Sequence, residues 1–182
     1  MACSNVPEPR VRLRIPTIDD VPLLDTWRLN MADGLGVFND FGQPFKSQMK
    51  TAEEMRFIEE VHGTFMVERV ADGVAIGTVD WRPAMYGPNP ESRAWAFGIS
   101  LAAEGRGQGY GAEAIRLLVE YLFETTSASR IEGSTDIENV ASQRALEKAG
   151  FTREGVARKA QFRAGELHDL VLYSRLRDDL SS

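Results

Sequence analysis

The sequence predicts a single α+β domain, with about seven strands and about four helices around one hydrophobic core. Three observations lead to this expectation. The chain has 182 residues, which suits one domain and is too short for two with good interiors. Apolar residues alternate in some segments and recur at helical spacing in others. The composition, with 43% hydrophobic and 26% charged residues, is typical of a globular protein.

The N-terminal part is predicted to contain a strand and two helices. Residues 11–15 alternate apolar side chains with arginines, which predicts a strand with one face toward the core. Residues 17–27 begin with capping oxygens and continue with two leucines and a tryptophan, which predicts a helix whose apolar face includes Leu23. Residues 51–61 begin with a capping box and predict a second helix. The segment 30–48 between them, rich in Gly, Asn and Phe, is expected to be a loop.

The middle of the chain is predicted to be antiparallel. Two β-rich runs, 64–70 and 74–81, are separated by Ala71-Asp72-Gly73, and Asp and Gly can adopt the positive φ of a hairpin turn. Residues 85–90 contain two prolines, which lack the N–H group that a sheet interior requires, so a loop is expected there.

The strand predicted over 93–101 has two unlike faces. Its bulky positions are Trp95, Phe97, Ile99 and Leu101, and its small ones are Ala94, Ala96, Gly98 and Ser100. A face of small residues lets another molecule approach the backbone, and it equally suits a closely packed helix. The pattern alone leaves both interpretations open.

The C-terminal part alternates helices and strands. Residues 110–126 carry apolar side chains at helical spacing and predict an amphipathic helix packed on the core. Gly150 is expected to end a later helix in the left-handed conformation. The remaining predicted elements are a strand over 130–135, a helix over 140–149, a strand from 151 onward, a turn at 163–166 and a last strand over 168–176.

Charge and cysteine content exclude several classes of protein. The formal net charge of −6 and the pI near 5.1 argue against a nucleic-acid binder, because phosphate backbones require clustered Lys and Arg. The single cysteine, Cys3, makes disulfides and a cysteine nucleophile unlikely candidates. Neither His nor Cys recurs at metal-ligand spacing, so no metal is expected. With no run of ~20 apolar residues to cross a bilayer, we expect a cytoplasmic protein without a membrane partner.

A glycine-rich loop, Glu104 to Gly111, lies between the two-faced strand and the amphipathic helix. Glycines there expose backbone N–H groups at the positive end of the helix dipole, where a pyrophosphate can bind. Arg106 adds a positive charge. Replacing Gly109 by valine is expected to block the phosphates while leaving the fold largely intact.

Other glycine motifs compete for this loop. No Lys-Ser or Lys-Thr follows the last glycine, which excludes a Walker loop. Gly107, Gly109 and Ala112 formally fit a dinucleotide fingerprint, with Glu132 about twenty residues further on as the ribose-binding acid. However, too little chain follows to complete that fold. A purely structural turn is a further alternative.

Arg106-x-x-Gly109-x-Gly111 resembles the coenzyme A pyrophosphate loop of the GNAT (Gcn5-related) N-acetyltransferase family. Asn139-x-x-Ser142, Leu146 to Phe151 and Glu154-Gly155 resemble the downstream motif of that family, at the expected separation. The order of elements is also similar from about Val11 onward. The branch that includes the ribosomal-protein acetyltransferases RimJ and RimL is the most similar, and it carries an Asp and a Tyr resembling Asp169 and Tyr173.

This resemblance implies a fold, an activity and partners. The fold would be one GNAT domain over residues 11–178, with a mixed, mostly antiparallel sheet, after a flexible segment 1–10. The activity would be transfer of an acetyl group from acetyl-CoA, as cosubstrate, to a primary amine by direct attack in a ternary complex. The acceptor would be a peptide N-terminus or a small molecule, and the protein a monomer or homodimer.

The resemblance also implies site residues. Asn139 would lie beside the pantetheine arm, and Ser142 near the thioester sulfur, where its hydroxyl could protonate the departing thiolate. A backbone N–H around Ile99 to Leu101 would stabilise the oxyanion. The full set expected to bind coenzyme A is Ile99, Ser100, Leu101, Arg106, Gly107, Gln108, Gly109, Tyr110, Gly111, Asn139, Ser142 and Lys148.

The general base is not assigned by these motifs. Some relatives carry a carboxylate where this chain has Gln161, and an amide cannot accept a proton in that role. The sequence offers four replacements, namely Glu68, Asp80, Asp136 and His168. Gln161 also favours an alternative function, a non-catalytic protein that binds or senses acyl-CoA.

Overall fold

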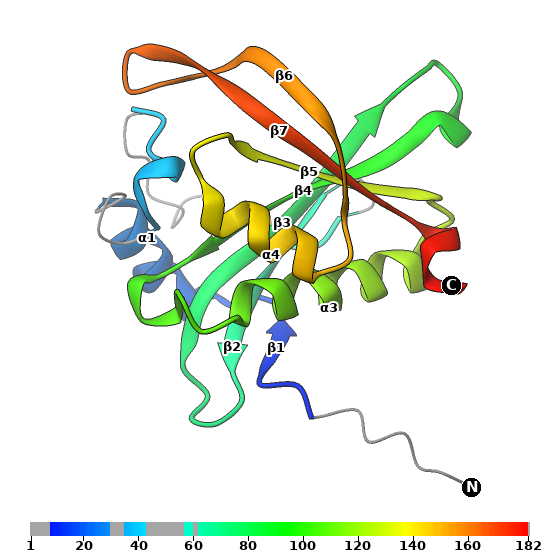
Figure 1. The fold of residues 1–182 in the computed structure, drawn as a ribbon. Coiled ribbons are helices and arrows are strands. Elements are labelled where there is room, and N and C mark those ends of the chain that lie inside the picture. Colours follow the sequence, from blue (N-terminus) through cyan, green and yellow to red (C-terminus); the bar gives the residue numbers. More distant parts are fainter. Residues whose placement is uncertain (1–7, 30–34, 43–56, 60–61, 182) are drawn as a thin grey trace, which may run out of the picture.

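The computed structural model describes residues 8–29, 35–42, 57–59 and 62–181 (Figure 1). Most of the helix predicted over 51–61 and most of the loop predicted over 30–48 lie outside these residues. The strands are β1 (Val11–Arg14), β2 (Gly63–Arg69), β3 (Ala75–Met85), β4 (Arg93–Leu101), β5 (Arg130–Asp136), β6 (Thr152–Arg163) and β7 (Glu166–Leu176). The α-helices of the described residues are α1 (Val21–Leu29), α3 (Tyr110–Thr125) and α4 (Val140–Lys148).

All seven strands form one sheet, in the order β1-β2-β3-β4-β5-β7-β6. Every neighbouring pair is antiparallel except β4 and β5, which are parallel. These two strands are in register only at Trp95 with Ile131 and Ala96 with Glu132, and then they part. The predicted α+β fold with a mixed, mostly antiparallel sheet is confirmed.

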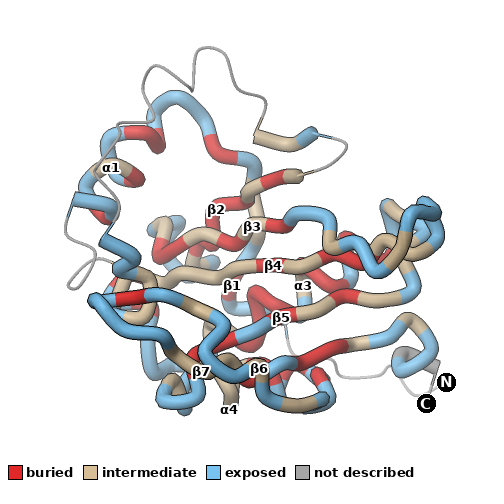
Figure 2. Tube along the Cα trace, turned by 90° about the horizontal axis from the view of Figure 1, so that it is seen from above, coloured by how far each residue is buried: buried red, intermediate tan, exposed pale blue. Residues whose placement is uncertain are grey.

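The main core lies between α3 and one face of the sheet. Ile115, Leu118 and Leu122 of α3 are at most 1% exposed and pack with the bulky face of β4. Each such side chain contributes about 1.5–3 kcal/mol when fully buried. Figure 2 shows that burial is concentrated in the central strands and that β6, at the sheet edge, is largely exposed.

A second, smaller core holds α1 against the sheet. Leu24 and Trp27 pack with Met66 of β2 and with Ala102 just after β4. Leu23, predicted to face inward, is instead 36% exposed. Successive residues of a helix are rotated by about 100°, so burying Leu24 and Trp27 turns Leu23 aside.

Two strands are longer than the sequence indicates. β3 continues past Trp81 through Pro83 to Met85 and still pairs with β4 there. Proline is tolerated because β2, the other neighbour of β3, ends its pairing at Trp81, so no N–H is needed on that side. β7 begins at Glu166, directly after a tight turn in which Ala164 and Gly165 both have positive φ.

Candidate active site

The parting of β4 and β5 opens a cavity of about 1490 Å³ in the sheet. Its walls include the second half of β4, from Phe97 to Leu101, and residues 133–135 of β5. The glycine loop, the first turn of α4, α1, residues 35–41 and β3 also line it. A cavity of this size has room for two ligands beside the backbone of β4.

The glycine loop joins this cavity to the start of α3. Gly107 has φ +72° and Gly109 has φ +86°, both in the left-handed region that glycine adopts readily. Gly109 is the N-cap of α3 and has no side chain to accept from the first N–H groups of the helix. These donors and the helix dipole are suited to holding an anion, and we refer to them as the candidate anion site.

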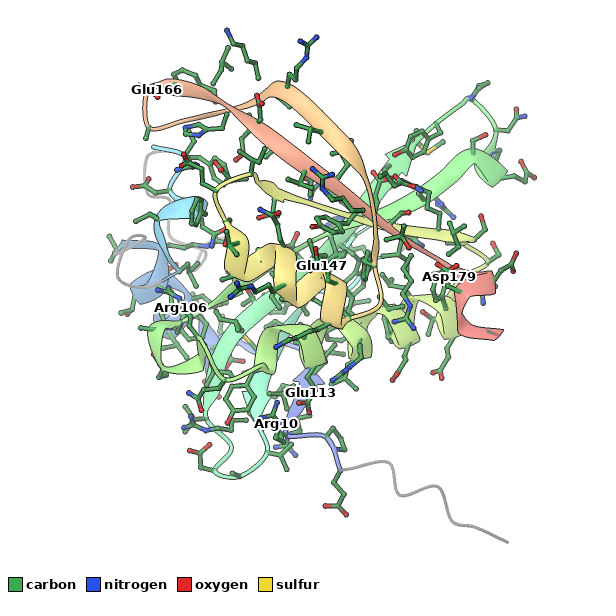
Figure 3. All side chains as sticks on the ribbon, viewed as in Figure 1. Arg10, Arg106, Glu113, Glu147, Glu166 and Asp179 are labelled. Atoms are coloured by element: carbon green, nitrogen blue, oxygen red, sulfur yellow. The ribbon has the colours of Figure 1, made fainter. Side chains whose placement is uncertain are left out.

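Arg10 and Glu113 lie next to each other near the start of α3, and Arg10 contacts the loop (Figure 3). Glu113, in the first turn of α3, is 8% exposed and accepts from the backbone N–H of Val11 at 3.2 Å and from Arg10 Nε at 3.1 Å. Arg10 Nη1 also donates to the carbonyl of Gln108 at 3.1 Å, and its guanidinium lies 5.0 Å from the ring centre of Tyr110. Arg10, the last residue of the segment 1–10, thus contacts both the loop and α3.

Gln108 and Tyr110 do not line the cavity, unlike the ten other predicted CoA-binding residues. The Gln108 side chain turns back to donate to the Glu104 carbonyl at 2.8 Å. Tyr110 stacks with Arg10. Any contribution of these two residues to binding is confined to their backbone.

The conformation at Gly109 complicates the test proposed for it. A Cβ on Gly109 would lie 3.2 Å from Arg10 Nη2, and the positive φ strains any L side chain. Valine at this position would therefore strain the loop as well as block the phosphates, and the expectation of a largely intact fold stays a prediction. Gly107 offers a cleaner test, because a Cβ there would meet no atom within 4 Å.

Arg106 connects the loop to the opposite wall. Its Nε donates to the Leu101 carbonyl at 2.9 Å, at the end of β4. Its guanidinium carbon lies 3.4 Å from the position a Cβ would occupy on Gly36, which has φ +92°. Arg106 therefore lies between the candidate anion site and residues 35–41.

The first turn of α4 brings Asn139 and Ser142 to the cavity. The Asn139 Oδ1 accepts from the Ser142 N–H at 3.1 Å, which confirms the predicted helix cap. Lys148 lines the cavity further along α4, together with Arg144, which sequence reasoning missed. Their i, i+4 spacing, which places both cations on one helix face, was the available signal.

Three of the four candidate bases are engaged in ion pairs away from the cavity. Glu68 is 5% exposed; burial would raise its pKa, but hydrogen bonds from Arg14 and Arg12 lower it. Asp136 is 3% exposed, and although burial opposes this, the Glu138 N–H and Arg163 lower its pKa.

His168 belongs to the same ion-pair cluster as Asp136. Its Nδ1 lies 3.2 Å from the Asp136 Oδ2, and its Nε2 lies 3.1 Å from the Arg163 carbonyl. Asp80 and Gln161, by contrast, both line the cavity.

Asp169 and Tyr173, the pair that resembles the RimJ and RimL branch, have structural contacts. Tyr173 is 1% exposed, and its hydroxyl donates to Glu147 of α4 at 3.1 Å. Burial, together with that hydrogen bond, raises the pKa of Tyr173. Asp169 accepts from the Lys159 N–H at 2.8 Å and does not line the cavity.

The dinucleotide alternative does not fit this geometry. Glu132, its proposed ribose-binding acid, accepts from the Tyr86 hydroxyl at 2.5 Å and from Arg130 Nε at 3.1 Å, outside the cavity wall. A single parallel strand pair also excludes the doubly wound parallel sheet of that fold.

The described residues contain no cluster of three or more His, Cys, Asp or Glu side chains that could hold a metal ion. In the same part of the chain, every helix is too short or too polar to cross a bilayer.

A mixed, mostly antiparallel sheet with helices, whose parallel strand pair parts beside a glycine loop, defines a protein of the α+β class. The sequence model of the acetyltransferase (GNAT) domain matches residues 10–152. The chain belongs to the GNAT family, as the motif resemblance predicted.

Individual relatives agree with this assignment. The probable N-acetyltransferase YjcK of Bacillus subtilis (strain 168) is 38% identical over 107 residues, which are 59% of this chain and 56% of that protein. The chain thus spans about half the length of the curated relatives it matches.

Solved structures share the fold at low sequence identity. RimJ of Mycobacterium smegmatis, in complex with CoA-disulfide, has a TM-score of 0.79 at 20% identity, covering 94% of this chain and 84% of that one. Spermidine N-acetyltransferase of Vibrio cholerae, with CoA and spermine, has a TM-score of 0.75 at 20% identity, covering 95% and 99%.

Proposed function

We propose that this protein is an N-acetyltransferase that moves an acetyl group from acetyl-CoA to a primary amine of a protein N-terminus or a small molecule. The observation that carries the proposal is one continuous cavity, lined by the candidate anion site of backbone N–H groups and by an open strand backbone. A donor and an acceptor bound in this cavity could react directly in a ternary complex, without a covalent enzyme intermediate.

The residues present fit coenzyme A. The N–H groups of Gly107 to Gly111 and the guanidinium of Arg106 would hold the pyrophosphate. Lys148 and Arg144, both exposed on α4, would attract the remaining phosphate. The backbone of β4 from Ile99 to Leu101 would pair with the amides of the pantetheine arm, beside Asn139. The active domain would comprise residues 11–178.

The bound thioester supplies an acyl carbon that an amine can attack. One N–H group within Ile99 to Leu101, on the side of β4 away from β3, would stabilise the developing oxyanion. One such donor typically contributes a factor of about 10²–10³ in rate. The hydroxyl of Ser142 would donate a proton to the departing thiolate. A free amine with a pKa of ~10 is mostly protonated in the cell, so it must lose one proton before it can attack. The attacking amine then loses a second proton as the amide forms.

The relatives' names suggest which acceptors to try. They include a putative ribosomal N-acetyltransferase of Bacillus subtilis and a spermidine N-acetyltransferase of Vibrio cholerae, so ribosomal proteins and polyamines are the first acceptors to test. The net charge of −6 favours a cationic acceptor over nucleic acid. We also place the protein in the cytoplasm, as a monomer or homodimer and without a membrane partner.

A thiol-release assay tests the proposal. Purified protein is mixed with acetyl-CoA and a panel of peptides with free N-termini, polyamines and amino sugars, and released thiol is measured. We expect turnover with at least one class of amine. Failure to bind any acyl-CoA by calorimetry would overturn the proposal.

A non-catalytic acyl-CoA binder is the second candidate, and the observation that favours it is Gln161 in the cavity wall. It requires tight acyl-CoA binding with no turnover across the same panel. Acetylation of a single amine at an enzymatic rate would exclude it.

A further inference from the structure

Asp80 occupies a distinctive place in the part of the cavity wall that β3 forms. It lies on β3 directly opposite Gly98 of β4, and both residues line the cavity. The Asp80 Oδ2 is 2.9 Å from the position that a Cβ on Gly98 would occupy. No Cβ can fit there without moving the carboxylate. Gly98 on the small face of β4 therefore makes room for an acid.

The other described acidic side chain of the cavity wall is differently placed. Asp40 is exposed, in the segment 35–41, and its Oδ1 accepts from the Gly42 N–H at 3.0 Å. Glu68 and Asp136 are held by arginines outside the wall. Among the described residues, Asp80 is thus the acid that the strands themselves fix in the cavity.

The charges around Asp80 leave it able to exchange a proton. Partial burial raises the pKa of Asp80, and Arg82 and Arg28 oppose the increase. Arg82 is the next residue on the same face of β3, with its Nη1 3.7 Å from the Asp80 Oδ1, and Arg28 belongs to α1. The facing residue of β4, Gly98, carries no charge. An acid whose pKa is raised toward neutrality is a better proton acceptor than an ordinary one.

Asp80 is also close to the proposed oxyanion donor. Ile99 to Leu101 lie one to three residues beyond Gly98 on the adjacent strand. At ~3.4 Å per residue, these N–H groups are roughly 3–10 Å along the sheet from the Asp80 pairing position. An amine between them can reach the carboxylate directly or through one water molecule.

We propose that Asp80 is the general base of the acetyl transfer, the role that Gln161 cannot fill. This inference rests on the proposed function. The ammonium form of the acceptor first loses a proton to solvent. As the neutral amine nitrogen then forms its bond to the acyl carbon, one of its two remaining protons passes to the Asp80 carboxylate. The carbon–sulfur bond then breaks, and Ser142 protonates the thiolate. Proton exchange with solvent restores both side chains.

The test compares D80N with D72N, a matched Asp-to-Asn change in the β2–β3 turn, where Asp72 pairs with Arg69. With the best amine from the panel, we expect D80N to lose ~10²–10⁴-fold in kcat, the range for a missing general base. D72N should retain the wild-type rate, and D80E should recover part of it. Affinity for CoA should stay within about threefold in all variants, because Asp80 lies on β3, outside the residues proposed to hold CoA.

Two further readouts separate a base from a structural residue. In the wild type, kcat/KM should fall as the pH drops through the raised pKa of Asp80. In D80N, this decrease of kcat/KM on the acidic side of the pH profile, its acidic limb, should be absent. D80N should also unfold at the same or a higher temperature, because a carboxyl whose pKa is raised by folding destabilises the folded state when it ionises.

G98A provides an independent variant should D80N fold poorly. An added methyl would displace the carboxylate while leaving both backbones unchanged in conformation, so kcat should fall with CoA affinity preserved. A D80N rate within about threefold of the wild type, with the acidic limb intact, would overturn the role of Asp80 while leaving the proposed function standing. A wild type inactive on every amine would overturn the proposed function itself.

Discussion

Replacing Gly107 by alanine should weaken coenzyme A binding without a matching loss of stability. Gly107 has φ +72°, and a Cβ there meets no protein atom within 4 Å. The positive φ costs an alanine about 1–2 kcal/mol. Alanine also lowers the conformational entropy of the unfolded chain, which stabilises the folded state by about 0.4–1 kcal/mol. The expected net loss of folding stability is therefore small, at most about 1.5 kcal/mol.

The binding loss should be larger. A phosphate oxygen must come within about 2.9 Å of a backbone nitrogen to form a hydrogen bond. At Gly107 an added methyl would exclude a phosphate oxygen from within about 3.5 Å of the new carbon, in the space where the phosphate would approach the loop. Losing one charge-assisted hydrogen bond of about 1.5–3 kcal/mol raises the CoA dissociation constant by a factor of about 10–150.

Gly165 supplies the matched control. It has φ +87° in the β6–β7 turn, also with no atom within 4 Å of a Cβ, so G165A carries the same backbone strain away from the cavity. Calorimetric titration with CoA and thermal unfolding should be measured for both variants. If G107A binds CoA as tightly as G165A does, the loop is not the phosphate site.

Three other variants test the site and the fold. S142A should lower the acetylation rate by about 10²-fold with CoA affinity retained. S127A, which changes an exposed serine, should keep the wild-type rate. Equal rates for the two variants would show that Ser142 is not the proton donor. N139A should reduce the free energy of unfolding by about 0.5–2 kcal/mol in urea, because the α4 cap is lost. Hydrogen bonds, first from Arg130, lower the pKa of Glu154 from 4.5 to about 2, so its stabilising effect is present above 4.5 and lost as pH falls toward 2. E154Q should therefore make the melting temperature depend less on pH between these values. An unchanged dependence would contradict the stabilising ion pair of Glu154 with Arg130.

The sequence was sufficient for features that depend on local conformation. Gly107 and Gly109 stand where the chain needs positive φ, and glycine is the residue that adopts it readily. Asn139 caps α4 as its type and spacing indicate. The bulky positions of β4 are those that pack on α3. In each case a residue's own chemistry dictates the geometry within a few neighbours.

Features that depend on tertiary pairing could not be predicted. Asp80 and Gly98 are neighbours only because of the register between β3 and β4, which no short motif encodes. Pro83 is tolerated in β3 because β2 stops short of it, a fact of sheet assembly. Likewise, nothing local distinguishes Asp80 from Glu68 and Asp136, whose arginine partners lie far along the chain or across the sheet.

The short overlap of β4 and β5 leaves an edge in the interior of the sheet rather than at its margin. Beyond Ala96, amide groups of β4 that point toward β5 have no strand beside them. Hydrogen exchange with deuterated water should therefore be faster at these amides than at their neighbours bonded to β3. An elongated ligand with its own carbonyl groups could accept hydrogen bonds from these N–H groups. Slower exchange along this stretch would therefore show that a ligand is bound, even when no reaction takes place.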